Sequence, residues 1–188
     1  MTDAVRAPDA TAAISTLAPG TAVIFRHYDA PGRADLGRRL RALARRRRLF
    51  FLVAGDWRLA RMLRADGLHL PAGMARRFRH FAPAPFDGLV SAAAHGPGEA
   101  WRAARAGADL VLLSPVFPTA SHPERSALGP LRLAALAGRL PVPVLALGGV
   151  SAANVRRVRL AGAAGVAGIG AVARLGRDPL GLRRPPHR

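Results

Sequence analysis

Polar side chains that could bind a ligand are concentrated in the stretch LLSPVFPTASHPERSALG, residues 112–129. The apolar run over 110–113 stops at Ser114, and hydroxyl, imidazole, carboxylate and guanidinium groups follow it. An apolar strand that opens into so polar a loop is typical of a ligand-binding loop, because binding residues are often carried on loops at strand ends. A proline-rich surface loop without a ligand is the simpler alternative.

Two glycine-containing segments favour the binding of an anion. Gly148-Gly149 follows one apolar run, and Gly168-Ile169-Gly170 ends another and precedes a helical segment. Glycine lets the backbone approach a ligand closely, and N–H groups at the start of a helix attract negative charge. Tight turns also use glycine, so a purely structural role is the alternative.

Two absent residue types exclude whole classes of enzyme. All 29 basic residues are Arg, and the chain has no Cys. Without Lys there is no Schiff-base aldolase chemistry, and without Cys there is no thiolate nucleophile, disulfide or thiolate metal site.

The formal net charge of +18 would suit an anionic partner such as nucleic acid. The Arg residues are spread over the expected helices, however, and only the run 45–48 is dense, at a helix end where cations are favourable. With seven Phe, two Trp and one Tyr, the chain offers no aromatic platform for bases. We therefore expect small molecules as partners, with nucleic acid supported by charge alone.

The length and the apolar runs indicate one domain over 1–188, with a frayed tail at about 177–188. No apolar run approaches the ~20 residues of a membrane span, and the start MTDAVRAPDATAA lacks the pattern of a signal peptide. We therefore expect a cytoplasmic protein that does not contact a membrane. A homo-oligomer is compatible with the sequence.

Short apolar runs alternate with helical segments rich in Arg, Ala and Leu, which is typical of βα units on a parallel sheet. The expected strands are 21–26, 49–54, 66–70, 88–93, 109–113, 142–147 and 165–169. The expected helices are 34–47, 57–65, 72–80, 97–106, 130–138, 151–161 and 171–176.

An open sheet and a (β/α)8 barrel both fit this alternation. In TIM barrels the functional groups follow the strands and meet at one face, often with a phosphate held after the seventh and eighth strands. Polar or glycine interruptions follow the expected strands here in the same way, at Arg26-His27, Gly55-Asp56, His69, His95, Ser114 to Glu124, Gly148-Gly149 and Gly170. The pattern favours a TIM barrel with all these groups on one rim.

The motifs SPVFPTASH, ALGGVSAANV and AGAAGVAGIGAV make the chain resemble the thiamine phosphate synthase and thiazole tautomerase superfamily. These proteins are small TIM barrels, and the synthases join a hydroxymethylpyrimidine pyrophosphate to a thiazole phosphate. The resemblance covers about 21–175, and its best part, 107–172, matches in motif order and spacing. It implies a thiamine phosphate synthase-like transferase of thiamine biosynthesis.

The resemblance also bears on the start of the chain. Relatives begin with a strand that ends in a Thr-Asp pair, and Met1-Thr2-Asp3 is similar to the last residues of that strand. We therefore expect a barrel that lacks most of its first strand, because of either a start assigned too late or a true truncation.

The resemblance implies which residues hold the pyrophosphate. Thr119, Ser121 and His122 stand where relatives have two hydroxyl residues and a Lys, and Arg26 matches the family's Arg. Arg26 and His122 are thus the expected catalytic residues, since they would neutralise the leaving group. Relatives also have a Gln and a Lys around that Arg, whereas this chain has Ile24 and Tyr28.

The thiazole phosphate site of the family corresponds to Gly148, Gly149, Ile169 and Gly170. The family's His and Glu near the fifth strand match His95 and Glu99. The family's substrate-contacting Ser falls at Ala93, and the nearby Ser91 is the expected substitute. His69 closes a strand and is expected to be structural.

The synthases hold Mg²⁺ with two Asp residues, but the corresponding positions here are Gly55 and Met74. Asp56 is one residue away from the first and is the expected metal ligand, while the second Asp has no replacement.

Three alternatives remain beside the synthase. A thiazole tautomerase needs a general acid/base His where this chain has Pro115, although His95 or His122 could take that part. A catalytically decayed barrel would bind the precursors without turnover. Nucleic-acid binding rests only on the charge.

Overall fold

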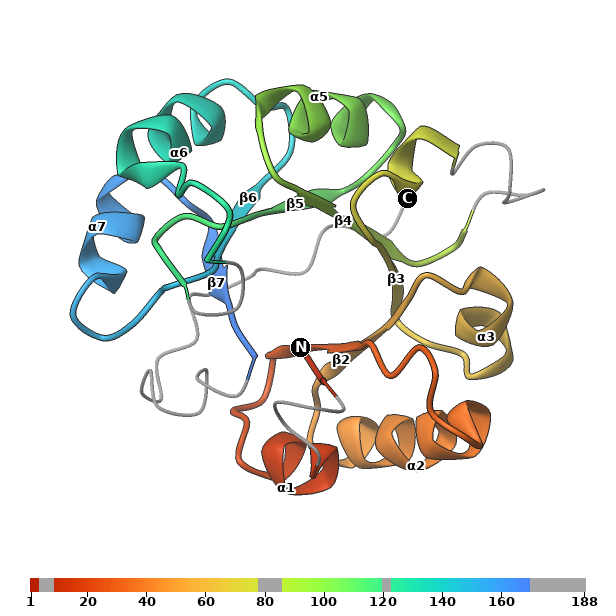
Figure 1. Ribbon diagram of the computed structural model, residues 1–188. Coiled ribbons are helices and arrows are strands. Elements are labelled where there is room, and N and C mark those ends of the chain that lie inside the picture. The colour runs from red at the N-terminus through yellow and green to blue at the C-terminus, as the bar shows by residue number, and fades with distance from the viewer. Residues whose placement is uncertain (4–8, 78–85, 120–122, 170–188) are drawn as a thin grey trace.

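The computed structural model describes residues 1–3, 9–77, 86–119 and 123–169. Its centre is a seven-stranded sheet in which each strand runs parallel to its neighbours, in the order β1 to β7. The strands are Ala22–Phe25 (β1), Phe50–Ala54 (β2), Gly67–Leu70 (β3), Leu89–Ala94 (β4), Leu110–Leu113 (β5), Val144–Leu147 (β6) and Gly165–Ala167 (β7). The sheet curls around a central space and the helices lie outside it (Figure 1).

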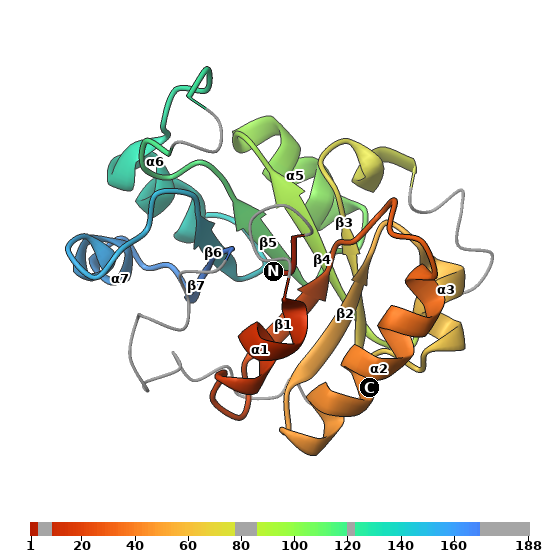
Figure 2. The same ribbon diagram turned by 60° about the horizontal axis from the view of Figure 1, so that its bottom comes forward.

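The helices after β1 connect successive strands, as the alternation predicted, and one short helix precedes β1. They are Ala10–Ser15 (α1), Arg33–Arg46 (α2), Trp57–Met62 (α3), Pro97–Arg105 (α5), Gly129–Ala137 (α6) and Val155–Leu160 (α7), with a 3₁₀ turn at Met74–Arg77 (η1). Figure 2 shows α1 and α2 side by side against the outer face of β1 and β2. The α/β fold and its curved, TIM-like parallel sheet are therefore confirmed. Among the described helices, none is long and apolar enough to cross a membrane.

Two expected helices differ from the structure in its described residues. The helix expected at 72–80 is only the turn η1, because Gly73 has φ +81° and ends any continuous helix from Pro71. The helix expected at 151–161 begins at Val155. The helix expected at 171–176 and the tail at 177–188 lie outside the described residues.

The helix α1 was not expected from the sequence. Its N-cap is Asp9, whose carboxylate accepts a hydrogen bond of 2.8 Å from the backbone N–H of Ala12. The buried face of this short helix is Ala10 and Ile14, which is too brief an apolar pattern to be distinguished from a loop.

The strands are buried on both faces, because helices cover one face and the curled sheet encloses the other. Residues that pack with the helices include Phe25, Phe51 and Val53. Their chain neighbours belong to a second, smaller apolar cluster made of strand residues alone, which fills the inside of the curl: Ile24, Leu52, Ala54, Leu110 and Leu112. This inner cluster is the floor beneath the site described next.

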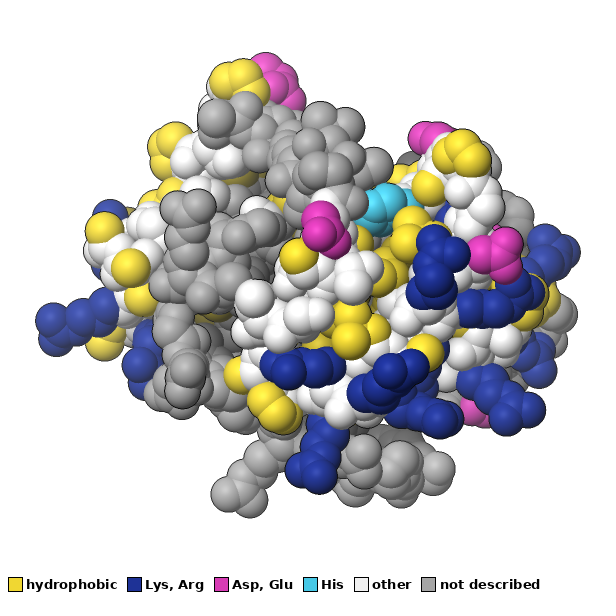
Figure 3. Space-filling model, turned by 90° about the horizontal axis from the view of Figure 1, so that it is seen from below, with side chains coloured by type: hydrophobic (Ala, Val, Ile, Leu, Met, Phe, Trp, Pro, Cys, Tyr) yellow, Lys and Arg dark blue, Asp and Glu magenta, His cyan; other side chains and the backbone are white. Residues whose placement is uncertain are grey.

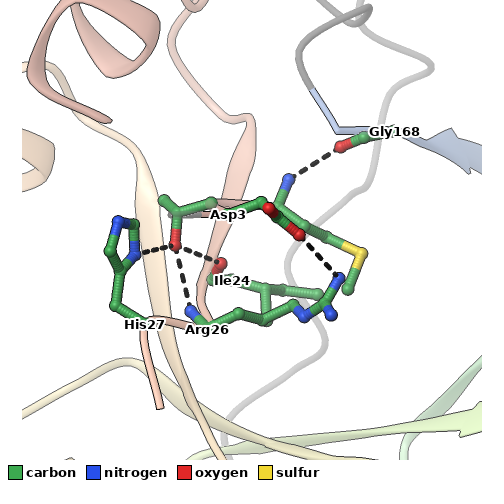
Figure 4. A network of polar contacts seen from close by, with 7 residues as sticks. Asp3, Ile24, Arg26, His27 and Gly168 are labelled. Carbon is green, nitrogen blue, oxygen red and sulfur yellow. Dashed lines mark hydrogen bonds and ion pairs between the residues drawn. The ribbon is translucent and has the colours of Figure 1, made fainter. Parts of the chain in front are cut away.

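Residues 1–3 lie between the two ends of the curled sheet. The backbone N–H of Thr2 donates to the carbonyl oxygen of Ile24 at 2.9 Å, in β1. On the other side, the amino nitrogen of Met1 donates to the carbonyl oxygen of Gly168 at 2.8 Å, just after β7 (Figure 4). The segment therefore links the first and last strands of the sheet.

Candidate functional site

A cavity of about 400 Å³ opens at the carboxyl ends of the strands. Its lining comes from the segments that follow β1, β3, β4, β5, β6 and β7, so a parallel barrel brings distant residues together here. Six residues expected from the sequence line it: Arg26, His95, Thr119, Gly148, Gly149 and Ile169. The expected residues Ser121, His122 and Gly170 lie outside the described part of the chain.

Arg26 is the one arginine among the described residues that line the cavity. It follows β1, and its side chain is 28% exposed. One guanidinium nitrogen, Nη1, lies 3.9 Å from Oδ2 of Asp3, which is longer than a hydrogen bond (Figure 4). The guanidinium thus remains able to form short bidentate hydrogen bonds with a phosphate group.

The side chain of Thr2 holds the backbone at the end of β1. Its Oγ1 accepts a hydrogen bond of 3.0 Å from the N–H of Arg26 and lies 3.0 Å from Nδ1 of His27 (Figure 4). His27 is buried and stacks on Phe25, and burial lowers the pKa of its imidazole. Thr2 therefore positions Arg26 through its backbone.

Gly149 forms the closest backbone approach in the cavity. Its φ is +65°, and a Cβ atom there would lie 2.4 Å from the carbonyl oxygen of Pro118 and 2.7 Å from that of Phe117. Only glycine fits between the β6 turn and the loop after β5. The side chain of Asn154 braces the turn, since its Nδ2 donates to the carbonyl oxygen of Gly149 at 2.8 Å.

The backbone and the ring of His95 are both held by hydrogen bonds. Its backbone N–H donates to Oε2 of Glu99 at 2.7 Å, and its ring Nδ1 lies 2.9 Å from the carbonyl oxygen of Ser114. Because a carbonyl oxygen can only accept, Nδ1 carries the proton in the neutral ring. The other ring nitrogen, Nε2, is then a hydrogen-bond acceptor in a residue that lines the cavity.

His69 lines the cavity, whereas Ser91 does not. Ser91 is 1% exposed, and its Oγ lies 2.9 Å from Nδ1 of His69 on the neighbouring strand. Burial, followed by the positive charges of Arg26 and the N-terminal amino group, lowers the pKa of His69 to about 4. The ring is therefore neutral near pH 7.

Sequence reasoning expected the ligand contact at Ser91 and a structural role at His69, whereas in the structure His69 lines the cavity and Ser91 is buried beside it on the neighbouring strand. The signal that could have found His69 is its place near the end of a buried strand, close to the rim, where a polar ring is exceptional. The register that pairs it with Ser91 is a tertiary feature.

Asp56 does not line the cavity among the described residues. Its Oδ1 accepts a hydrogen bond of 2.9 Å from the N–H of Leu59 and caps α3, while its Oδ2 lies 3.5 Å from Nη1 of Arg33. Both carboxylate oxygens thus have structural partners.

The described residues do not fit a magnesium site. Within these residues, no group of three or more His, Asp or Glu side chains is close enough to share an ion. Magnesium prefers oxygen ligands that include one or two carboxylates, and the described lining of the cavity contains neither Asp nor Glu. The two positions that match the family's Asp residues are a turn glycine, Gly55, and the exposed Met74.

The arginines are distributed over the surface. Figure 3 shows dark-blue Arg side chains over much of the lower part of one face, several of them next to one another at the right and others apart at the left. Many of the helical arginines are exposed, as expected for solvated positions.

Comparisons with known proteins agree with this geometry. The family described as thiamine monophosphate synthase matches residues 3–172. The thiamine-phosphate synthase of Geobacillus kaustophilus is 38% identical over 143 residues, which are 73% of this chain and 63% of the relative. That of Thermus thermophilus is 34% identical over 155 residues, 78% of this chain and 72% of the relative.

A solved structure, the thiamine phosphate pyrophosphorylase from Pyrococcus furiosus, superposes with a TM-score of 0.78 at 29% identity. The superposition covers 92% of this chain and 84% of that one. The chain spans less than two thirds of several curated relatives, such as 63% of the Geobacillus kaustophilus protein. On the matched residues and the barrel geometry together, the chain belongs to the thiamine monophosphate synthase family.

Proposed function

We propose that this chain condenses hydroxymethylpyrimidine pyrophosphate with thiazole phosphate, and so forms thiamine phosphate and pyrophosphate. One observation carries the proposal: in a member of this family, a guanidinium and a glycine turn line the same cavity at the carboxyl ends of the strands. The guanidinium of Arg26 suits the pyrophosphate, and the backbone of Gly148 and Gly149 suits the phosphate of the second substrate.

The reaction makes modest demands on side chains. The C–O bond to the pyrophosphate breaks, both electrons leave with the pyrophosphate, and the electron-rich aminopyrimidine stabilises the methylene cation. The lone pair of the thiazole nitrogen then forms the new C–N bond. The protein has to position two reactants and neutralise a leaving group, which a cavity without a described carboxylate can do.

The proposed roles follow the two walls of the cavity. Arg26 and Thr119, together with Ser121 and His122, bind the departing pyrophosphate. Gly148, Gly149, Ile169 and Gly170 hold the thiazole phosphate. This division is supported by the positions of those members that the structure describes, which line one cavity.

We propose that the pyrimidine lies against the part of the cavity lined by His69 and His95, between the pyrophosphate site and the thiazole phosphate site. His95 and His69 are the groups proposed to contact its ring, and the buried Ser91 would orient His69 through their contact. The Nε2 acceptor of His95 suits the exocyclic amino group of the pyrimidine.

The position of residues 1–3 suggests a relation to an eight-stranded barrel. We propose that they occupy the place of the carboxyl end of a first strand, because Met1 and Thr2 form backbone hydrogen bonds to the segments at both ends of the sheet. The loss of most of that strand stays a prediction, and the intact mass of the native protein tests it. A cytoplasmic location and a homo-oligomer also stay predictions.

Product formation tests the function directly. The full chain is incubated with both substrates, with and without Mg²⁺, and the product is oxidised to fluorescent thiochrome. We expect thiochrome from the wild-type chain and at least a tenfold loss in Arg26→Gln, while the exposed Arg61→Gln serves as the matched control.

A second candidate function is precursor binding without turnover, favoured by the misfit of the magnesium ligands. A well-folded chain that binds both substrates and yields no thiochrome would support it. The tautomerase alternative has less support, because Pro115 stands at the position of its catalytic His and itself lines the cavity.

A further inference from the structure

The described residues that line the cavity are either basic or uncharged. Beside uncharged residues they include Arg26, His69 and His95, and no Asp or Glu is among the described lining residues. The carboxylate of Asp3 forms a long ion pair with Arg26, 3.9 Å from its guanidinium. The positive charge of Arg26 is, after burial, a second cause of the lowered pKa of His69, which also lines the cavity.

Asp56 is held away from the cavity by Arg33. The guanidinium of Arg33 donates from Nη2 to the carbonyl oxygen of Ala54 at 2.7 Å and stacks on the rings of Phe25 and Tyr28, each 5.5 Å from its centre. It is therefore fixed, and its Nη1 lies 3.5 Å from Oδ2 of Asp56. To reach a metal ion, Asp56 would have to give up this contact and its cap on α3.

Position 55 does not tolerate the carboxylate that relatives have. Gly55 has φ +72°, and a Cβ atom there would lie 3.2 Å from the ring of Tyr28. An Asp at this position would be strained and would press on the ring of Tyr28, so this turn disfavours the usual ligand.

These contacts change the electrostatics of pyrophosphate binding. Mg²⁺ normally joins a diphosphate to one or two protein carboxylates. The described lining holds no such carboxylate, and the nearby carboxylate of Asp3 is already paired with the guanidinium of Arg26, so the site offers a divalent cation little net attraction. The magnesium complex of pyrophosphate also carries two fewer negative charges than the free anion, so the attraction of Arg26 for it is weaker.

We propose that this site binds pyrophosphate as the free anion, with the guanidinium of Arg26 supplying the positive charge that Mg²⁺ supplies in relatives. The proposal deepens the proposed function, on which the identity of the ligand rests. Its test needs no turnover, so the two can fail separately.

The test is calorimetric titration of inorganic pyrophosphate into the full chain, in Mg²⁺ and in EDTA at matched ionic strength. We expect the affinity in EDTA to equal or exceed that in Mg²⁺. Arg26→Gln should lower the affinity at least tenfold in both buffers, whereas Arg61→Gln, an exposed arginine on α3, should leave it unchanged. Asp56→Asn keeps the capping oxygen and should also leave it unchanged.

Two results overturn the proposal. One is an affinity that rises tenfold or more with Mg²⁺, especially if Asp56→Asn abolishes the rise. The other is the absence of binding in both buffers, or binding that Arg26→Gln does not weaken.

The binding inference and the proposed function can be tested independently. Magnesium-independent binding without thiochrome leaves the inference standing and removes the proposed function. Thiochrome formation combined with magnesium-dependent pyrophosphate binding does the reverse.

Discussion

The two walls of the cavity that we propose bind anions are built in different ways. At the end of β1 the wall is a side chain, Arg26, whose backbone is held by the hydroxyl of Thr2. At the end of β6 the wall is backbone alone, since Gly149 packs against the carbonyl groups of residues 117 and 118. Where the wall is a side chain, a substitution can change its chemistry. Where the wall is backbone, a substitution either preserves the turn or disrupts it.

This contrast bears on where the chain departs from the pattern that the family resemblance implies. Those departures are Ile24, Tyr28, Gly55, Met74, Ala93 and His122, and none of them belongs to the turn Gly148-Gly149. The glycine turn keeps the family's pattern, because any Cβ at Gly149 would overlap two carbonyl oxygens.

The largest effect should come from breaking the backbone wall. In Gly149→Ala, the new methyl group meets the carbonyl oxygen of Pro118 at 2.4 Å on a backbone with positive φ. We expect a loss of about 3 kcal/mol in the free energy of unfolding, measured by urea denaturation, from overlap and strain together.

Gly20→Ala is the matched control for that experiment. Gly20 has φ +83°, and a methyl group added there would have no heavy atom within 4 Å, so this variant reports the backbone strain alone. Its expected cost is about 1 kcal/mol. Equal stability of the two variants would contradict the close approach at Gly149.

The second effect is a loss of folding stability at low pH, which depends on His69 and on the charge of Arg26 in the side-chain wall. The pKa of His69 is lowered to about 4 in the folded chain, against an ordinary value of 6.5. The unfolded chain therefore binds more protons between these values, and stability falls as the pH falls from about 6.5 towards 4. The loss should reach up to about 3 kcal/mol.

His69→Gln should remove this part of the pH dependence. Arg26→Gln should shift the window upwards, because the charge of Arg26 is one cause of the lowered pKa. Identical urea midpoints for the wild-type chain at pH 7 and pH 4.5 would contradict the assignment.

A third, smaller effect concerns the support of Arg26. Thr2→Val keeps the shape but removes the oxygen that accepts from the Arg26 N–H and contacts His27. The buried groups left unpaired should cost about 1–3 kcal/mol in thermal or urea unfolding. Thr2→Ser keeps the hydroxyl and should be nearly neutral. A valine variant as stable as the serine variant would rule out this support.

The smallest effect is expected outside both walls. Asp56→Asn keeps the cap on α3 and loses only the charge of a 3.5 Å ion pair between the mostly buried Arg33 and the more exposed Asp56, so the free energy of unfolding should change by about 1 kcal/mol or less. Asp56→Ala also loses the cap and should cost about 1 kcal/mol more. A large loss in the Asn variant would show that the Arg33 contact matters more than its geometry indicates.

Local chemistry made much of the barrel predictable. All seven strands were expected near their observed positions, because short apolar runs bounded by Gly, Pro and Arg-rich helices admit few other folds. Parallel strands bring the residues after them to one face, and six of the expected site residues line one cavity there; Ser121, His122 and Gly170 lie outside the described residues. The local pattern was weak in two places. The helix α1 was not expected, and a helix was expected over 72–80 where the described residues form only the turn η1.

The residue sequence determined the order of strands, the excluded chemistries, and the glycines and the arginine of the cavity. Only the tertiary structure decided that His69 and not Ser91 lines the cavity, that Asp56 caps a helix beside Arg33, and that Thr2 supports Arg26. The pairs His69–Ser91, Arg33–Asp56 and Thr2–Arg26 each join residues at least 22 positions apart. They depend on register and on how the sheet curls, and neither is encoded in any single stretch of the chain.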